Sequence, residues 1–230
     1  TLPINRNFTW NSNLNFSFNK SKVMNLLLIN FNYFSVRSPH FEEGLPVDAI
    51  YSYHYLGENN DGIPYMRAIG ENTFTMNDPH PVTSDDREYM EYSGSAQPTT
   101  VIGWQNGFSA FGFNLNFLIN GEFGHIFRRP TFNYGILSNT KTSSTVHRDL
   151  SQVLSSSSKE IPNMPPPTAA NLGNWGGYAE FLNTTIEEAD NFRLKEVNLS
   201  YDIPAKALSA VGFNSARLFF QIRDPKMVWV

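Results

Sequence analysis

The chain contains no cysteine and few charged residues, and each shortage excludes a class of protein or site. Without cysteine there can be no disulfide framework, thiolate metal site or cysteine nucleophile. Charged residues make up 17% of the 230 residues, below the roughly 25% of ordinary soluble domains. The net charge is −4, so the composition indicates neither a nucleic-acid partner nor a polybasic patch that binds membranes.

Long apolar runs are missing as well. The nearest candidate, residues 24–29, is far shorter than the roughly 20 apolar residues that a membrane-spanning helix requires. Residues 1–10 also lack the basic start and apolar run of a signal peptide. We therefore expect a mature or truncated start to the chain.

Aromatic residues are abundant, at 14% of the chain, with 19 Phe and 10 Tyr. Much of the polar surface must then come from Asn, Ser and Thr. Soluble proteins usually keep apart from one another through surface charge. A chain rich in aromatic and neutral polar groups is instead typical of a protein with a solvent other than water on part of its surface.

Residues 7–19 alternate between two kinds of side chain. Even positions hold Phe, Trp, Ser, Leu, Phe and Phe, whereas odd positions hold only Asn, Thr and Ser. A period of two predicts a strand with one apolar and one uncharged polar face. Eleven residues at about 3.3 Å each, tilted by about 40°, cover about 28 Å of height, close to the apolar band of about 25 Å on an outer-membrane barrel. The aromatic residues lie towards both ends of this strand, as in interface girdles.

The same alternation recurs along the chain and predicts six to ten strands in all. Residues 100–108 and 111–119 form two further segments, with a tight turn expected over residues 107–110. Residues 197–201 and 218–222 alternate too, and residues 46–56 form a weaker, tyrosine-rich strand. Residues 57–97 and 121–191 are expected to be long loops, and residues 204–208 a helical turn on the periplasmic side.

The pattern favours an all-β fold, an antiparallel transmembrane β-barrel that is partial and has long outer loops. A soluble β-sandwich that acts as a carbohydrate-binding module of the cell surface is the alternative. For the barrel, the side chains that we expect to face lipid are Phe8, Trp10, Leu14, Phe16, Phe18, Phe111, Phe113, Leu115, Phe117 and Ile119.

Several stretches resemble the C-terminal barrel region of SusC/RagA-type TonB-dependent outer-membrane transporters, and together they cover nearly the whole chain. The most specific match is residues 192–204, FRLKEVNLSYDIP, which are similar to the family's Phe-x-Arg-Leu-Lys-Asn-Val-x-Leu-Ser-Tyr-x-Leu-Pro signature. Residues 8–23 resemble a strand that ends in Asn-Lys-x-Lys-Val. Residues 43–64, 85–98 and 107–124 resemble further landmarks in the same order.

The resemblance has limits that affect what it implies. Residues 223–225 are Arg-Asp-Pro where the family usually has Gln-Asn-Leu, which puts the local register in doubt. Residues 77–81 lack the Asp-rich loop of some members, so no metal is expected. The plug domain and the final closing strand are expected to be absent from residues 1–230, which would be the C-terminal portion of a larger barrel.

No group of residues indicates catalysis. The five histidines are widely spaced, without the i, i+4 pair of a helical zinc site, and no serine has a nucleophile-elbow context. We expect no enzyme activity and no cofactor. Aromatic side chains in the long loops are the candidates for contact with a substrate or a partner, because aromatic faces stack on sugar rings. They are Trp175, Tyr178, Tyr89 and Tyr92.

The resemblance implies TonB-dependent import of glycans, oligosaccharides or peptides across the outer membrane of a Gram-negative bacterium. The implied partners are a SusD-like surface lipoprotein, TonB acting through the missing plug, and outer-membrane lipid. The resemblance also implies a dimer of transporter–lipoprotein pairs. No nucleic-acid partner is expected.

Overall fold

The computed structural model describes residues 2–5, 7–26, 41–61, 63–68, 72–75, 89–131, 147–149, 179–209, 212–226 and 228–230. The chain divides into two compact units. Unit 1 contains residues 1–19, 98–125 and 189–230, and unit 2 contains residues 20–97 and 126–188. Among the described residues strands outnumber helices in both units and pair antiparallel with their neighbours, so the predicted all-β, antiparallel class is confirmed.

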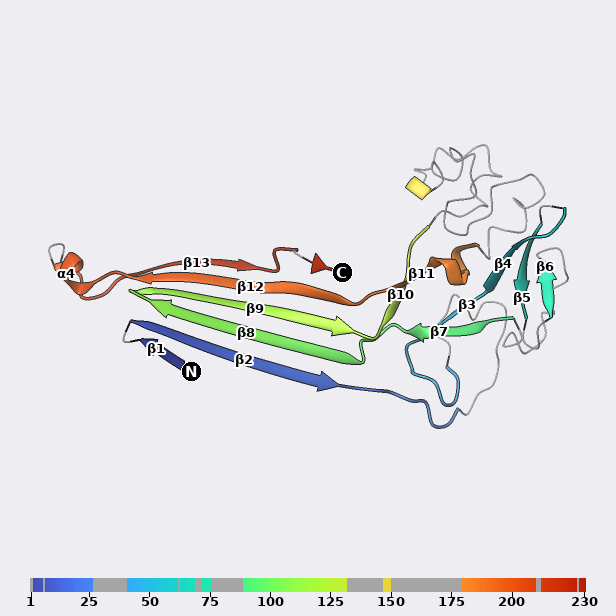
Figure 1. Ribbon diagram of the computed structural model, residues 1–230, viewed down its shortest axis with the longest axis horizontal. Coiled ribbons are helices and arrows are strands. Elements are labelled where there is room, and N and C mark those ends of the chain that lie inside the picture. Colours follow the sequence, from blue (N-terminus) through green and yellow to red (C-terminus); the bar gives the residue numbers. More distant parts are fainter. Residues whose placement is uncertain are drawn as a thin grey trace. The chain divides into compact units, whose positions relative to one another are not determined.

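Unit 1 is one open sheet of seven strands in the order β1-β2-β8-β9-β12-β13, with β14 pairing with β12 beside β13 (Figure 1). Four of its strands have 11 or 12 residues, about twice the usual strand length. The long alternating segments of the sequence are these long strands. The strands are β1 (Leu2–Asn5), β2 (Phe8–Phe18), β8 (Thr100–Ala110), β9 (Phe113–Phe123), β12 (Asn191–Asp202), β13 (Arg217–Arg223) and β14 (Val228–Trp229).

Strands β2 and β8 pair without interruption from Phe8 opposite Ala110 to Phe18 opposite Thr100. Residues directly opposite one another in a sheet share a face. Leu14 therefore shares its face with Trp104, and Trp104 with Ile119 of β9. The two unlike faces predicted from residues 7–19 thus continue across the neighbouring strands.

The predicted turn over residues 107–110 is wrong, because β8 runs straight through it to Ala110. The turn lies at Phe111 and Gly112, whose φ angles are 51° and 86°. Two successive positive φ angles define the type I′ turn that matches the twist of a two-residue hairpin. Gly107 resembles a turn residue in the sequence, yet a Cβ there would lie only 2.6 Å from the Asn116 side-chain oxygen. Its small size makes room for a neighbouring side chain.

Strand β12 contains a bulge at Lys195, where Leu194 pairs with Ile119 and Glu196 with the adjacent Leu118. The extra residue changes which positions face each side. Before the bulge the even positions Phe192 and Leu194 share the apolar face, and after it the odd positions from Val197 onward do so. The bulge therefore keeps one continuous apolar face although the sequence changes phase.

The chain reverses after β12 through a short helix, α4 (Ala205–Leu208), which confirms the predicted helical turn at residues 204–208. Strands β13 and β14 then run along the same edge of β12, separated by residues 224–227. Asp224 and Lys226 have φ angles of 46° and 58°. This irregular backbone lies where the sequence departs from the family pattern, and the Asp224 N–H donates to the Lys195 carbonyl at 2.7 Å.

The described residues of unit 2 form three small sheets, β3–β7, β4–β5–β6 and β10–β11. Its core contains the fully buried side chains Tyr53, Met66 and Leu182, and Phe74 packs edge-on against Tyr53. The elements are β3 (Ala49–Ser52), β4 (His54–Glu58), β5 (Pro64–Arg67), β6 (Thr73–Thr75), β7 (Glu91–Ser95), β10 (Ile126–Arg128), η4 (Ala179–Phe181), η5 (Asn183–Thr185) and β11 (Ile186–Glu188).

Two predictions for this part of the chain need correction. The single strand expected over residues 46–56 is two strands, because Tyr53 between β3 and β4 bridges to Leu182 instead. The sheet of unit 1 has seven strands, within the six to ten expected, but residues 57–97 and 121–191, expected to be long loops, contain β5, β6, β7, β10 and β11. Most of the additional strands are only three to five residues long, too short to show an alternating pattern in the sequence.

Within the described part of the chain, no helix combines the length and the apolar character needed to cross a membrane.

Candidate functional site

One face of the unit 1 sheet is apolar and largely uncovered. Leu14, Phe16 and Phe18 remain 68%, 67% and 64% exposed. Large apolar surfaces of this kind normally mark a site of contact with a partner or a membrane. Apolar residues that share this face by register are Phe8, Trp10, Leu14, Phe16 and Phe18 of β2, Ile102, Trp104 and Phe108 of β8, Phe113, Leu115, Phe117 and Ile119 of β9, Leu194, Val197, Leu199 and Tyr201 of β12, and Leu218, Phe220 and Ile222 of β13. Phe111, also expected to face lipid, lies in the β8–β9 turn instead.

The centre of the apolar face contains one polar pair, Ser12 opposite Asn106. Both accept hydrogen bonds from indole N–H groups, Asn106 from Trp10 at 3.1 Å and Ser12 from Trp104 at 2.9 Å. The rings of Trp10 and Phe108 stack with centroids 6.2 Å apart. Asn106 is only 1% exposed. The aromatic residues therefore cover Asn106, whereas Ser12 stays exposed and has its hydroxyl oxygen paired with the Trp104 N–H.

The opposite face is polar, and its charged residues lie on β9, β12 and β13 rather than on β2 and β8. Strands β2 and β8 contain no charged residue at all, and β9 contains only Glu122. In register, rows composed mainly of amide and hydroxyl side chains cross five strands. One row is Thr9, Ser109, Asn114, Ser200 and then Phe219, and the next is Asn11, Gly107, Asn116, Asn198 and Gln221.

Two shallow pockets lie on this polar face. The first, of about 420 Å³, is bordered by Asn11, Asn13, Gln105, Gly107 and Asn116. The Asn116 side chain takes up part of the space beside Gly107, since its oxygen lies 2.6 Å from where a Cβ would be. The side-chain amides of Asn11, Asn13, Gln105 and Asn116 can each donate and accept hydrogen bonds.

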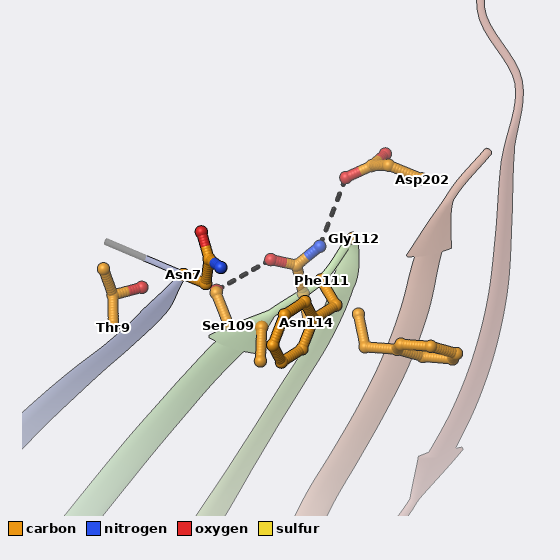
Figure 2. Close-up of a pocket in the computed structure, with 9 residues that line it drawn as sticks. Asn7, Thr9, Ser109, Phe111, Gly112, Asn114 and Asp202 are labelled. Atoms are coloured by element: carbon orange, nitrogen blue, oxygen red, sulfur yellow. Dashed lines mark hydrogen bonds between the residues drawn. The ribbon is translucent and has the colours of Figure 1, made fainter. Parts of the chain in front are cut away.

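The second pocket, of about 400 Å³, lies at the end of the sheet that carries the β8–β9 turn (Figure 2). The Ser109 hydroxyl donates to the Asn114 side-chain oxygen at 2.7 Å, and the Asn114 amide donates to Asp202 at 3.2 Å. These bonds fix the Asn114 amide orientation. The lining residues are Asn7, Thr9, Ser109, Ala110, Phe111, Gly112, Phe113, Asn114 and Asp202.

Asp202 is also paired with Arg217 on β13. The Arg217 Nε and Nη2 atoms donate to the two carboxylate oxygens at 2.5 and 3.1 Å, a two-point geometry. Further along the face, Glu196 accepts from the amides of Asn198 and Gln221 at 2.6 and 2.8 Å. Glu196 and Asp202 thus both have hydrogen-bond partners, and Asp202 has its charge balanced by Arg217.

The aromatic residues predicted to contact a substrate or partner fall into two groups. Trp175 and Tyr178 lie outside the described residues. Tyr89 packs edge-on against Phe74 at 4.9 Å, whereas Tyr92 is 42% exposed and contacts Tyr51. Burial, together with the negative charge of Asp48, raises the pKa of Tyr92, which keeps its hydroxyl protonated at neutral pH. Tyr92 therefore offers a ring and a hydrogen-bond donor at the surface of unit 2.

Polar groups inside unit 2 hold its strands together. Arg128 donates to the carbonyls of Tyr51 and Glu180 and to the Thr185 hydroxyl, and its guanidinium lies 5.1 Å from the centre of the Phe181 ring. Burial lowers the pKa of Arg128 to about 10, so it remains charged at neutral pH. We therefore assign Arg128 a structural role, in which it holds the strands of unit 2 together.

Sequence reasoning missed the Ser109–Asn114–Asp202–Arg217 chain of hydrogen bonds. Its outer members are far apart in sequence, and only the strand register brings them together. The sequence held one signal for this chain of hydrogen bonds. An acidic residue, Asp202, ends the segment 191–202, and a basic residue, Arg217, begins the next strand.

Across the described ranges, no cluster of three or more His, Asp or Glu side chains is arranged to hold a metal ion.

No protein-family profile matches the sequence, and no curated protein matches it. Solved structures do. The chain is similar to a chain of the RagAB peptide importer in its "open-open" state (17% identity, TM-score 0.67) and in its "closed-closed" state (16%, 0.66). It is also similar to a chain of the RagAB peptide transporter (18%, 0.64). Each match covers 98% of this chain but only 24% of the other, so the chain spans about a quarter of their length. At this identity the match shows the fold, a partial, open antiparallel β-structure like a portion of those importer chains.

Proposed function

We propose that the chain forms part of the barrel wall and outer loops of a SusC/RagA-type importer in the outer membrane of a Gram-negative bacterium. The importer would carry glycans, oligosaccharides or peptides inward. Residues 1–230 would be the C-terminal portion of its barrel, with the plug domain and the final closing strand supplied by other parts of the protein.

The observation that carries this proposal is the two-faced sheet of unit 1. Its long strands match the thickness of an outer membrane, and one face leaves large apolar side chains uncovered. In lipid every backbone polar group needs a partner, which a closed barrel provides. The apolar face would contact lipid, including Phe8, Trp10 and the other side chains named for it above.

The polar face supports the role of a pore lining. Neutral amides and hydroxyls would line a wet interior without strong charge selectivity. The compact loops of unit 2 would then form the outer region, where Tyr89, Tyr92, Trp175 and Tyr178 are the proposed contacts for substrate or for a SusD-like surface lipoprotein. Energy would come from TonB acting on the plug, and two transporter–lipoprotein pairs would form a dimer.

A soluble β-sandwich that binds carbohydrate is less well supported. In a sandwich the apolar face of one sheet packs against another sheet and becomes buried. Leu14, Phe16 and Phe18 are mostly exposed instead. The similarity to importer chains points in the same direction.

Uptake by cells tests the proposal. Cells that carry or lack the gene would be given labelled oligosaccharides and, separately, labelled peptides. We expect uptake of at least one class to require the gene and to stop when an uncoupler removes the proton-motive force or when TonB is deleted. Equal uptake with and without the gene for both classes would contradict the import function.

A further inference from the structure

Residues 19–23, Asn-Lys-Ser-Lys-Val, follow β2 directly and contain two lysines whose role the fold does not explain. The backbone N–H groups of the first and last of these residues donate to carbonyls of other segments, at 2.8 and 2.9 Å. The Ser21 hydroxyl donates to the Asp48 carboxylate at 3.5 Å. Contacts within the protein therefore account for alternate positions of this motif, whereas Lys20 and Lys22 call for another explanation.

Both lysines have free ammonium groups in the described part of the chain. Each residue is exposed, and neither takes part in an ion pair with a described residue. Lys22 is close to Gly44, where a Cβ would lie 4.0 Å from the lysine Cε. The acidic residue next to Gly44 is Glu43, which instead accepts a hydrogen bond from the Leu26 N–H at 2.8 Å. These residues thus leave two neighbouring positive charges uncompensated.

The place of the lysines along the chain brings them to the membrane boundary if β2 crosses the membrane. Lys20 and Lys22 come two and four residues after Phe18, the last residue of β2. The chain can therefore carry them at most about 7 and 14 Å from the end of the strand. Phe16 and Phe18 are 67% and 64% exposed, and aromatic rings gather at the edge of the hydrocarbon. The head-group layer beyond that edge is about 5–7 Å deep, within reach of both lysine side chains.

We propose that Lys20 and Lys22 bind the head group of a membrane lipid that carries a phosphate monoester, in the leaflet at the Phe18 end of β2. The two ammonium groups would donate hydrogen bonds to the phosphate oxygens, and the acyl chains would pack on apolar side chains of β2. The inference rests on the proposed function, because it requires β2 to span the membrane and to face lipid.

Charge favours a phosphate monoester over other lipid head groups. A monoester carries about −1.5 to −2 charges at neutral pH and has three strong acceptor oxygens. Two ammonium groups, each with three N–H donors, match both the charge and the acceptors. A phosphodiester has a single negative charge, and a zwitterionic head group has no net charge to offer. Free phosphate would match the charge but would lack the acyl chains that contact the apolar face.

Native mass spectrometry of the full-length protein in detergent, with one lipid added at a time, tests the inference. The probes share the same acyl chains and are phosphatidic acid (a monoester), phosphatidylglycerol (a diester) and phosphatidylcholine (a zwitterion). We expect phosphatidic acid to have the lowest dissociation constant for the first lipid bound. Lys20→Gln and Lys22→Gln should each weaken its binding about fivefold, as loss of one basic residue near an anionic lipid surface does, and together by more than tenfold.

Matched variants separate this site from general effects of charge and from loss of folding. Lys206→Gln removes the same charge from an exposed position in α4 and should leave the affinity unchanged. Lys20→Arg combined with Lys22→Arg keeps both charges and should retain most of the affinity. Heat-dependent mobility on gels would show that each variant is folded. Inorganic phosphate at the concentration of the lipid should not displace it.

Three results would overturn the inference: equal affinity of the parent protein for all three lipids, equal affinity of the double glutamine variant and the parent for phosphatidic acid, or displacement of the lipid by inorganic phosphate. Loss of binding to a partner lipoprotein in the double variant, with lipid affinity unchanged, would assign the lysines to that partner instead. Cellular uptake that persists despite such a result would leave the import function standing. A parent protein that neither imports nor binds lipid would reject both.

Discussion

Individual residues in this protein are small or polar for reasons that only the register reveals. Gly107 is extended, in the middle of β8, and its missing side chain leaves space for Asn116 on the next strand. Asn106, its neighbour in sequence, points to the other face, where Trp10 satisfies its oxygen. Adjacent residues therefore serve opposite surfaces, and neither role can be inferred from the residue type alone.

Asp48 also leads to a prediction at the residue scale, about how the stability of unit 2 depends on pH. Burial alone would raise the pKa of Asp48, but hydrogen bonds from the Ser95 hydroxyl and the Gln97 N–H, the latter at 2.6 Å, outweigh it and lower the pKa below its ordinary value of 3.8. The stability that this carboxylate contributes is therefore complete above that value and is lost as the pH falls through the lowered pKa. We expect Asp48→Asn to destabilise unit 2 by about 1 kcal/mol at neutral pH.

Hydrogen exchange at the Gln97 amide measures this effect. Exchange should speed up in Asp48→Asn at neutral pH, and the parent protein should lose the same protection only in strong acid. Asp61→Asn removes a carboxylate from an exposed loop of the same unit and should change nothing at Gln97. Unchanged protection of Gln97 in Asp48→Asn would show that the carboxylate does not hold this turn.

At the scale of elements, long strands could be predicted from the sequence and short ones could not. Residues 8–18 alternate over their full length, and β2 has these bounds. Strand β12 alternates in two phases, and the Lys195 bulge that joins them depends on pairing with β9. Strands such as β6 have three residues, too few for any period to appear. The hydrogen-bonded chain from Ser109 to Arg217 was likewise beyond prediction, because it needs the pairing of four strands.

The two faces of β2 lead to a prediction about stability, in which the same substitution is compared at two neighbouring residues. Leu14 lies near the middle of the apolar face and Asn13 on the polar face at the same height. An arginine that faces lipid near the bilayer centre costs about 2–4 kcal/mol. We expect Leu14→Arg to lower the free energy of unfolding in vesicles by that amount and Asn13→Arg to lower it much less.

Urea titration of the full-length protein in lipid vesicles, followed by the heat-dependent shift on gels, would measure both variants. Because the two substitutions add the same side chain one residue apart, strand propensity and net charge are matched. Equal costs at the two positions would mean that β2 does not separate lipid from water.

At the scale of the whole molecule, the sheet of unit 1 has unpaired edges and a lone apolar face, and the chain spans about a quarter of the importer chains that it resembles. In the proposed function, further strands would close this sheet and lipid would cover its apolar face. The composition agrees with this account, because a chain with few charges and many aromatic residues is suited to a membrane. What composition could not give is the arrangement of unit 2, whose core depends on contacts such as that of Tyr53 with Leu182.

The central claim is that the unit 1 sheet separates lipid from water, and the absence of cysteine from this chain makes a direct measurement straightforward. Single cysteines placed in turn at each position of β2 (Phe8–Phe18) in the full-length protein would carry a nitroxide label in lipid vesicles. Collision with dissolved oxygen reports exposure to lipid, and collision with a water-soluble nickel complex reports exposure to water. The account predicts strict alternation, with oxygen favoured at even positions from Phe8 to Phe18 and nickel at the odd positions between them. Equal access of the nickel complex to both sets of positions would contradict it.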